Sequence, residues 1–235
     1  MNLLLVGYGK MGKIVEQMAL RRGHSIAGRI DIDNSDELDR ATADVAIEFS
    51  HPNAAFDNVR RCIERGIPVV CGTTGWLSRK GEIEKLVSER NGTFFYASNF
   101  SLGVNIFFKV NEYLARIMNS FPEYEISLDE IHHSEKKDAP SGTAITLAEG
   151  ILRNVDRKKK WILGSGNTDD IAITAFRIDQ IPGTHVVKYA SRIDDIEIKH
   201  TAHSREGFAL GAVMVAEWIL DKKGCLSMDE FLKIL

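Results

Sequence analysis

The feature that constrains this chain most is a glycine-rich turn placed directly between a buried strand and a helix. Leu3 to Val6 is an unbroken apolar run, the turn contains Gly7, Gly9 and Gly12, and apolar residues then recur at helical spacing. In such a turn the first glycine permits a tight bend, the second lets a ligand approach the backbone, and the third allows the helix to pack closely on the strand. The segment therefore predicts a parallel sheet in which a pyrophosphate can lie against the helix N-terminus.

Strand-like and helix-like segments alternate in the first part of the chain. Further strand-like segments cover residues 25–31, 43–49, 67–71 and 93–97, and helical patterns cover residues 54–65 and 78–90. Repeated alternation implies right-handed crossovers and a parallel sheet covered by helices on both faces. We predict an α/β protein that combines a Rossmann-type, doubly wound parallel sheet with a second α+β domain that contains a mixed sheet.

Two turns at predicted strand ends add to the candidate dinucleotide site. The second strand-like segment ends in Asp31, about 20 residues beyond the glycines, where a carboxylate can accept hydrogen bonds from the adenosine ribose. Asp33 is the alternative acid, and either residue could be only a polar strand end. Gly72, Thr73 and Thr74 follow the fourth strand-like segment, where flexible backbone and hydroxyl groups can meet a dinucleotide that crosses the sheet.

The remaining segments predict a second domain followed by a return to the first. A long helix is expected from Gly103 to Phe121, ended by Pro122. β-rich segments follow at residues 171–178, 185–190 and 196–201. The apolar helix predicted at residues 208–220 should pack back on the first domain. We therefore expect a discontinuous dinucleotide-binding domain, residues 1–103 and 206–235, and a substrate-binding domain, residues 104–205.

Residues 130–144 gather proton donors, cations and a helix-opening turn in one short run. The alternating segment from Glu123 to Asp129 indicates a half-buried strand, so His132 and His133 lie near a strand end. Strict alternation would direct these two histidines to opposite faces, unless the strand ends between them. The run therefore places a titratable proton donor at the end of a strand.

A helix is predicted to start within the same run. Apolar residues recur at helical spacing from Ile145 onward, and Ser141 or Asp138 is the expected cap. Free backbone N–H groups at a helix start, next to a glycine such as Gly142, bind carboxylate or phosphate groups. Lys136 and the adjacent lysine would add positive charge. We therefore predict an anion site at this helix start.

Each of these features also has a simpler interpretation. A histidine at a strand end is more often a surface or hydrogen-bonded residue, a lysine pair is usually solvated, and a Ser-Gly-Thr helix start is usually only a cap. Their combination in one loop favours a functional site over these separate interpretations.

Composition excludes several functional classes. With 30 Lys+Arg against 33 Asp+Glu, the net charge of −3 provides no general attraction for nucleic acid or anionic membrane. The basic run at residues 157–160 is interpreted as a solvated helix end. Three scattered cysteines, Cys62, Cys71 and Cys225, do not suggest a disulfide framework or a zinc site, and they favour a cytoplasmic location. We expect neither a signal peptide nor a membrane span.

The motif that runs from His132 to Ala144, with Lys136, Asp138 and the Pro140-Ser141-Gly142-Thr143 turn, resembles the substrate motif of the 4-hydroxy-tetrahydrodipicolinate reductase (dihydrodipicolinate reductase) family. The turns at residues 72–75 and 98–105 look like that family's nicotinamide-side loops, and residues 200–209 resemble its return segment. The resemblance covers nearly the whole chain. It departs from the family pattern at residues 177–179, where Arg177 is followed by Ile178 and Asp179 instead of a glycine pair.

The resemblance implies an oxidoreductase of lysine and diaminopimelate biosynthesis that uses NADH or NADPH. Its substrate would be a cyclic 2,6-dicarboxylate, reduced by hydride transfer to C4 of an unsaturated imine and then protonated by a general acid. No metal is required for this chemistry, and the resemblance also implies a homotetramer formed through the second-domain sheets.

The resemblance and the motifs together give a set of candidate site residues. His132 is the expected general acid, with Lys136 as a helper or the alternative donor. The expected substrate-binding residues are His133, Gly142 and Thr143. The expected cofactor-binding residues are Gly7, Tyr8, Gly9, Lys10, Met11, Gly12, Asp31, Gly72, Thr73, Thr74, Ala97, Ser98, Asn99, Phe100 and Arg205.

Two other functions fit parts of the sequence. A semialdehyde dehydrogenase would use Cys71 as its nucleophile, although this residue has no neighbouring histidine in the sequence. A non-catalytic dinucleotide sensor would bind the cofactor without turnover.

Overall fold

The computed structural model describes residues 1–233 and divides the chain into two compact units. The first unit consists of Met1–Leu102 and the segment that begins at Glu206, and the second unit is Gly103–Arg205. Residues 234 and 235, which belong to the expected first domain, lie outside the described residues. Because each unit has its own sheet and its own buried clusters, the two are described separately.

The first unit contains a six-stranded parallel sheet in the order β11-β5-β4-β3-β1-β2. The strands are β1 (Asn2–Val6), β2 (Ser25–Ile30), β3 (Val45–Glu48), β4 (Val69–Cys71), β5 (Thr93–Tyr96) and β11 (Gly224–Leu226). The central strands are continuous apolar runs because both of their faces are covered, as parallel sheets require. The order changes direction between β1 and β3, which is where open α/β sheets bind ligands.

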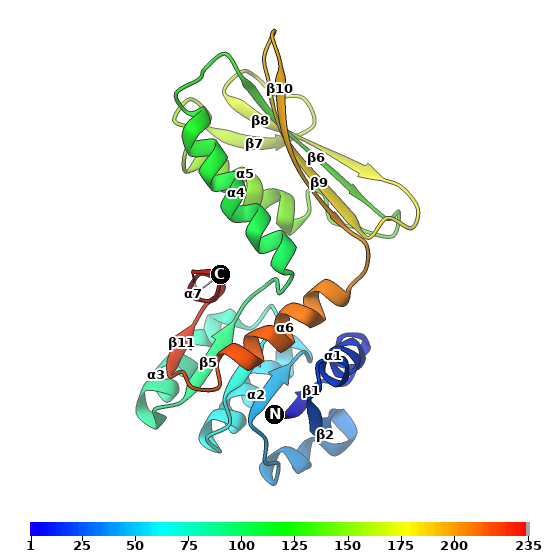
Figure 1. The fold of residues 1–235 in the computed structure, drawn as a ribbon, viewed down its shortest axis with the longest axis vertical. Coiled ribbons are helices and arrows are strands. Elements are labelled where there is room, and N and C mark those ends of the chain that lie inside the picture. The colour runs from blue at the N-terminus through cyan, green and yellow to red at the C-terminus, as the bar shows by residue number, and fades with distance from the viewer. Residues whose placement is uncertain (234–235) are drawn as a thin grey trace. The chain divides into compact units, whose positions relative to one another are not determined.

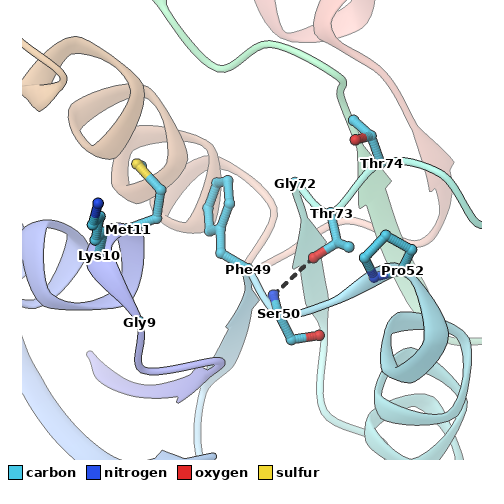
Figure 2. A pocket seen from close by; sticks show the side chains of 9 residues that line it. All are labelled: Gly9, Lys10, Met11, Phe49, Ser50, Pro52, Gly72, Thr73 and Thr74. Carbon is cyan, nitrogen blue, oxygen red and sulfur yellow. Dashed lines mark hydrogen bonds between the residues drawn. The ribbon is translucent and has the colours of Figure 1, made fainter. Parts of the chain in front are cut away.

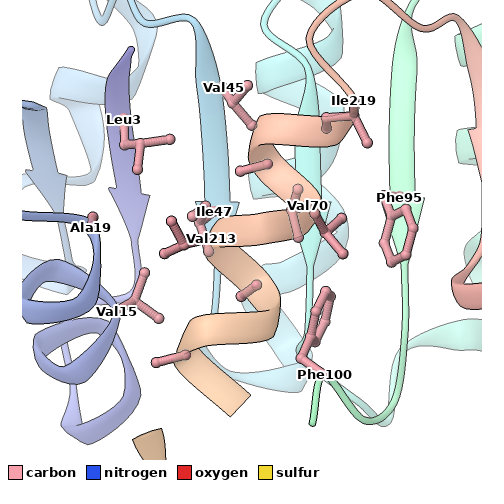
Figure 3. Close-up of a cluster of buried hydrophobic side chains, with 14 of the residues drawn as sticks. Leu3, Val15, Ala19, Val45, Ile47, Val70, Phe95, Phe100, Val213 and Ile219 are labelled. Atoms are coloured by element: carbon pink, nitrogen blue, oxygen red, sulfur yellow. The ribbon is translucent and has the colours of Figure 1, made fainter. Parts of the chain in front are cut away.

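Helices cover both faces of this sheet, which confirms the doubly wound α/β prediction. The α-helices of the first unit are α1 (Lys10–Arg21), α2 (Pro52–Glu64), α3 (Lys80–Arg90), α6 (Glu206–Trp218) and α7 (Met228–Leu232), and 3₁₀ segments cover Ile32–Asp39 and Leu77–Arg79. On β1, Leu3 and Leu5 face α1 and α6, whereas Leu4 and Val6 face α2 and α3. Figure 3 shows α6 lying across the strands with Val213 packed against Ile47. The expected return of this helix to the first part of the chain is therefore confirmed.

The second unit contains a five-stranded mixed sheet in the order β10-β9-β6-β8-β7 (Figure 1). The strands are β6 (Glu125–His132), β7 (Lys160–Leu163), β8 (Asp170–Arg177), β9 (Gly183–Ala190) and β10 (Asp195–Ala202). Helices α4 (Leu102–Met118) and α5 (Gly142–Leu152) pack on one face and bury Ile126, Leu128 and Tyr189. The predicted mixed sheet is confirmed.

The structure differs from the sequence-based predictions in three respects. The strands β7 and β11 and the short helix α7 were not expected. The strand predicted at residues 123–129 starts at Glu125 and continues to His132, so its buried face extends to Glu130 and His132. The interpretation of residues 157–160 as a solvated helix end holds for the exposed Lys159 and Lys160 only as regards exposure, because α5 already ends at Leu152. It is wrong for Lys158, which is 5% exposed and whose ammonium donates to Glu125 and to the carbonyls of Thr168 and Asp170.

Within residues 1–233, no helix combines the length and the apolar character needed to cross a membrane. The three cysteines are free thiols, of which Cys62 and Cys71 are buried and Cys225 is exposed.

Candidate active site

A pocket of about 350 Å³ lies in the first unit at the carboxyl ends of β1, β3 and β4 (Figure 2). It is lined by Gly9, Lys10, Met11, Phe49, Ser50, Pro52, Gly72, Thr73 and Thr74. The pocket therefore brings the glycine turn together with the predicted turn after β4, at the point where the strand order changes direction.

The three glycines of the first turn have different surroundings. Gly7 has a φ of +90°, and a Cβ atom there would lie 2.1 Å from the carbonyl oxygen of Phe49. A Cβ atom on Gly12 would lie 2.2 Å from the carbonyl oxygen of Gly7. Gly9 has nothing within 4 Å of that position, so its backbone is open to a ligand. The structure thus gives Gly7 and Gly12 a packing role and leaves Gly9 accessible.

Asp31 directly follows β2, next to the glycine turn, because the Gly7 amide donates to the carbonyl of Ile30 at 2.8 Å. The Asp31 carboxylate is exposed and accepts from the Ile32 amide at 3.0 Å, which caps the 3₁₀ segment. The alternative acid, Asp33, lies inside that segment and is also exposed. Asp31 is therefore the acid at the strand end.

Tyr8, within the glycine turn, forms part of a polar cluster. Its hydroxyl donates to the carboxylate of Glu16, which also accepts from the guanidinium of Arg29. The ring of Tyr8 lies within 6 Å of the charged groups of Lys13 and Arg29. A flat aromatic ring and two cations therefore lie beside the glycine turn.

The structure places the predicted residues of the β5 loop differently from one another. Ala97 and Phe100 are buried, whereas Ser98 is exposed. The Phe100 side chain belongs to the hydrophobic cluster under α6, and the residue as a whole is 1% exposed. Asn99 accepts from the Ser101 amide at 2.9 Å. Arg205 is exposed and follows β10.

Phe49, Ser50 and Pro52 line the pocket but were not among the predicted site residues. The Ser50 amide donates to the Thr73 hydroxyl at 2.8 Å, which links the turns after β3 and β4 (Figure 2). A Cβ atom on Gly72 would lie 2.0 Å from the Phe49 ring, so the ring packs directly on that glycine. The available signal was their position after a predicted parallel strand, because all such strand ends meet at one edge of the sheet.

Cys71 does not have the environment of a nucleophile. It is fully buried, and its thiol donates to the carboxylate of Glu48 at 3.0 Å. Burial, and the negative charge of Glu48 next to it, raise the pKa of the Cys71 thiol well above its ordinary value. A nucleophilic cysteine needs the opposite shift, so the dehydrogenase alternative loses its nucleophile.

The second unit gathers titratable groups at the end of β6. Glu130 and His132 occupy the buried, helix-facing side of the strand and are 0% and 7% exposed, whereas His133 follows the strand and is half-buried. His185, on the neighbouring strand β9, stacks edge-on against His132 with ring centroids 5.0 Å apart. The two consecutive histidines therefore have different environments, and sequence reasoning did not find His185.

Glu130 is held by contacts to both of its carboxylate oxygens. One oxygen accepts from the Ser141 amide at 2.9 Å, and the other accepts from the Arg177 guanidinium at 3.1 Å. Burial alone would raise the pKa of Glu130, but these hydrogen bonds outweigh it and hold the pKa below the ordinary value. Glu130 is therefore a buried anion with two fixed donors.

The two buried histidines are shifted toward the neutral form. Burial lowers the pKa of His132, and the charges of Lys136 and Arg177 act in the same direction, while Glu130 opposes them. Burial lowers the pKa of His185 to about 4. In the unliganded protein, His132 is therefore harder to protonate than a histidine in water.

The loop between β6 and α5 is held by charged groups. The Lys136 ammonium pairs with Asp138 at 2.8 Å, and the Arg177 guanidinium donates to the carbonyls of Lys136 and Asp138 at 3.2 and 2.6 Å. Residues 177–179, where the chain departs from the family pattern, contribute further contacts. The Ile178 amide donates to the carbonyl of His132 at 2.8 Å, and Asp179 accepts from Ser134. The departing segment thus supports the loop.

Helix α5 begins at Gly142, and Ser141, not Asp138, is its cap. The Ser141 hydroxyl accepts from the Ala144 amide at 3.2 Å and contacts His185 at 3.1 Å. The amides of Gly142 and Thr143 have no hydrogen-bond partner among residues 1–233, and the Cβ position of Gly142 is open. Two free N–H groups at the positive end of a helix form an anion site.

Glu130, His132 and His185 are also close enough together to be considered as metal ligands, with donor atoms within 4.8 Å of one another. However, both oxygens of Glu130 already accept hydrogen bonds, and Arg177 and Lys136 add positive charge to the cluster. A divalent cation would meet this charge without a free anion to offset it. We therefore assign no metal to the cluster.

Family models and curated relatives match nearly the whole chain. The family model for the N-terminal part of dihydrodipicolinate reductase matches residues 1–100, and the model for its C-terminal part matches residues 103–232. The 4-hydroxy-tetrahydrodipicolinate reductase of Christiangramia forsetii is 48% identical over 236 residues, which cover 100% of this chain and 99% of that protein. The corresponding enzyme of Archaeoglobus fulgidus is 34% identical, with 96% of each chain covered.

Solved structures share the fold. A dipicolinate-bound dihydrodipicolinate reductase from Paenisporosarcina sp. TG-14 superimposes with a TM-score of 0.79 at 18% identity, over 96% of this chain and 97% of the other. A putative myo-inositol dehydrogenase from Sinorhizobium meliloti gives a TM-score of 0.59 at 12% identity, over 94% and 89%. The family models and the full-length relatives together show that this chain belongs to the dihydrodipicolinate reductase family.

Proposed function

We propose that the chain reduces 4-hydroxy-tetrahydrodipicolinate, by way of dihydrodipicolinate, to tetrahydrodipicolinate, with NADH or NADPH as the hydride donor. Family membership makes it an oxidoreductase of lysine and diaminopimelate biosynthesis. One structural observation supports the chemistry most directly: the second unit holds a buried histidine, a lysine and a helix start with two free N–H groups on one loop.

The proton step is assigned to His132. A bound nicotinamide supplies the hydride to C4 of the unsaturated imine, and the resulting enamine needs a proton. His132 can donate that proton once a bound dicarboxylate has raised its pKa, because two negative charges favour the imidazolium form. Lys136 remains the alternative donor and must first leave its ion pair with Asp138.

Substrate recognition is assigned to the same loop. The amides of Gly142 and Thr143 would hold one carboxylate, and the open Cβ position of Gly142 gives a planar ring room to approach. Lys136 and His133 would contact the other side of the ring. A side chain added at Gly142 would meet no protein atom within 4 Å of its Cβ, so the role of this glycine can be tested by substitution.

The first unit is assigned as the dinucleotide domain, with the pocket after β1, β3 and β4 as its centre. We propose that NADH is used at least as well as NADPH, because a 2′-phosphate would meet the negative charge of Asp31. Lys10, which lines the pocket, would offset part of this repulsion.

The second unit is assigned as the substrate-binding and oligomerisation domain. One face of its sheet is covered by α4 and α5, whereas Phe176 on the opposite face is 44% exposed. Family resemblance favours a homotetramer formed through these sheets, and the three free thiols favour a cytoplasmic location. The expected tetramer can be tested by sedimentation.

A direct test follows the oxidation of NADH or NADPH by absorbance while the substrate is generated enzymatically. Turnover that depends on the substrate is expected, and cofactor binding without turnover would instead support the sensor alternative. In parallel, dipicolinate (pyridine-2,6-dicarboxylate) should bind as a competitor that cannot accept hydride. Gly142→Val should abolish this binding without affecting NADH affinity, whereas unchanged dipicolinate affinity would remove the helix start from the site.

A further inference from the structure

Glu130 connects more elements of the second unit than its place in the sequence suggests. It lies on β6, and its carboxylate accepts from the start of α5 through Ser141 and from β8 through Arg177. The same carboxylate lies 3.8 Å from the ring nitrogens of both His132 and His185. One fully buried carboxylate therefore lies next to the candidate general acid, His132, and also binds the helix start that forms the candidate anion site.

We propose that Glu130 is a positioning residue that sets both the charge state of His132 and the position of the α5 start. This inference rests on the proposed function, since it names what supports the general acid and the carboxylate site of that reaction. Glu130 itself does not touch the substrate in this scheme, because it is fully buried and both of its oxygens are already used.

The first role follows from the charges around His132. Lys136 from the loop and Arg177 from β8 are cationic and favour the neutral imidazole, while Asp138 and Glu130 are anionic and favour the imidazolium. Glu130 lies on the same strand as His132 and is more deeply buried than Asp138. Its electric field at His132 is therefore little screened by water. The neutral His185, on β9, adds no opposing charge near neutral pH. Glu130 therefore keeps proton donation by His132 within reach.

The second role follows from the contacts at the helix start. Ser141 is held twice, because its amide donates to Glu130 and its hydroxyl contacts His185. The next two amides, of Gly142 and Thr143, are the free donors of the anion site. A shift of Ser141 would move both of them, and a misplacement of about 1 Å can cost roughly 10²-fold in rate.

Two substitutions separate these roles. Glu130→Gln keeps the size of the side chain but removes the charge. Glu130→Asp keeps the charge but withdraws the carboxylate from Ser141 by one methylene group. Asp129→Asn is the matched control, because Asp129 is the adjacent acid on the same strand and lies on the opposite face of the sheet. Thermal unfolding and NADH binding are measured for all three variants.

For Glu130→Gln we expect a fall in kcat of roughly 10²-fold. The alkaline limb of the kcat profile should move to lower pH by on the order of one pH unit, because His132 loses the anion that favours its charged form. For Glu130→Asp we expect the pH limb to stay near its wild-type position while dipicolinate affinity falls at least tenfold. Asp129→Asn should match wild type in each measurement.

An unchanged pH limb and unchanged dipicolinate affinity in a folded Glu130→Gln variant would overturn the proposal. If that variant does not fold, Glu130→Asp decides the matter, and wild-type dipicolinate affinity in it would overturn the positioning of the helix start. Failure of the proposed function looks different, because wild type itself would then not turn over. In that case the pH dependence of dipicolinate binding, compared between wild type and Glu130→Asp, still tests the role of Glu130.

Discussion

The candidate sites of the two units are built from different kinds of groups. In the first unit, the pocket is formed mainly by backbone, small residues and one aromatic ring. In the glycine turn beside it, a Cβ atom added to Gly7 or Gly12 would lie 2.1 or 2.2 Å from a backbone carbonyl oxygen. In the second unit, the site is formed by charged and titratable side chains around Glu130, with Arg177 at 3.1 Å and His132 and His185 both at 3.8 Å from its carboxylate. The first site depends on glycines, which have no side chain, and the second depends on the balance between Glu130 and the cations around it.

This difference separates the perturbations to which each unit should respond. Added volume should damage the first unit, because its close contacts join backbone atoms that cannot move aside independently. Changes of charge or pH should act on the second unit, where several pKa values are displaced by burial and by neighbouring charges.

Replacing His132, the proposed general acid, should affect the second unit alone. We expect His132→Gln to lower kcat by on the order of 10²–10⁴-fold, the usual contribution of a positioned proton donor. NADH affinity should stay at the wild-type value, because His132 belongs to the second unit and the proposed nucleotide pocket is lined by residues of the first. Stopped-flow turnover and NADH fluorescence titration measure the two quantities. A His132→Gln enzyme with normal turnover would transfer the assignment to Lys136, for which Lys136→Ala is the corresponding test.

Adding a methyl group to the glycine turn should affect the first unit according to position. Gly12→Ala should lower the free energy of unfolding by about 1–3 kcal/mol, because its Cβ would lie 2.2 Å from the carbonyl oxygen of Gly7. Gly9→Ala meets nothing within 4 Å and should cost less stability while it weakens NADH binding. Urea denaturation and NADH titration of both variants give the comparison. Equal stability losses would mean that packing does not distinguish the two glycines.

Ligand binding should exchange protons in the second unit but not in the first. Burial and neighbouring cations lower the pKa of His132 in the free protein, so the ring is mostly neutral near pH 7. A bound dicarboxylate raises the pKa of His132. At a pH between the His132 pKa of the free protein and that of the complex, dipicolinate binding should therefore take up as much as about one proton. Calorimetry in buffers of different ionisation enthalpy counts these protons. Uptake should vanish in His132→Gln and be absent for NADH, and uptake that persists in the variant would assign the proton to another group.

Cofactor preference should show the smallest effect, because Asp31 is exposed and its charge is screened. Asp31→Ser should raise the ratio of NADPH to NADH in kcat/KM by about 2- to 5-fold, as expected for an exposed charge. Asp33→Ser is the matched control and should leave the ratio unchanged. A shift confined to Asp33→Ser would exchange the roles of the two acids, and a strong NADPH preference that survives Lys10→Ala would argue against this geometry.

The local parts of both sites could be predicted from sequence because each depends on neighbouring residues. A strand, a glycine turn and a helix in succession predict a nucleotide turn, and the structure places Gly9 at the helix start within the pocket. The start of α5 follows in the same way from turn chemistry and helical spacing, which left Ser141 or Asp138 as the cap until the structure selected Ser141. The roles of His132 and the other site residues stay predictions until they are tested.

Long-range contacts explain what was missed. Strand β11 has only the span Gly224–Leu226, too short for any periodicity, and it forms by pairing with Thr93 to Phe95 far earlier in the chain. Lys158 belongs to a run that resembles a solvated segment. It can be buried because its ammonium donates hydrogen bonds to the carbonyls of Thr168 and Asp170. Neither set of partners is visible from the residues themselves.

By itself, the sequence determined most of the order of strands and helices, all but β7, β11 and α7, together with the two turns that open α1 and α5 and the family to which the chain belongs. These depend on backbone preferences and spacing over a few residues. Only the tertiary structure decided that the buried Glu130 and His185 and the partly exposed Arg177 meet around His132, because three strands must pair in register before these side chains meet. The charge state of a buried group depends on such neighbours, so the chemistry of the site is a property of the folded sheet.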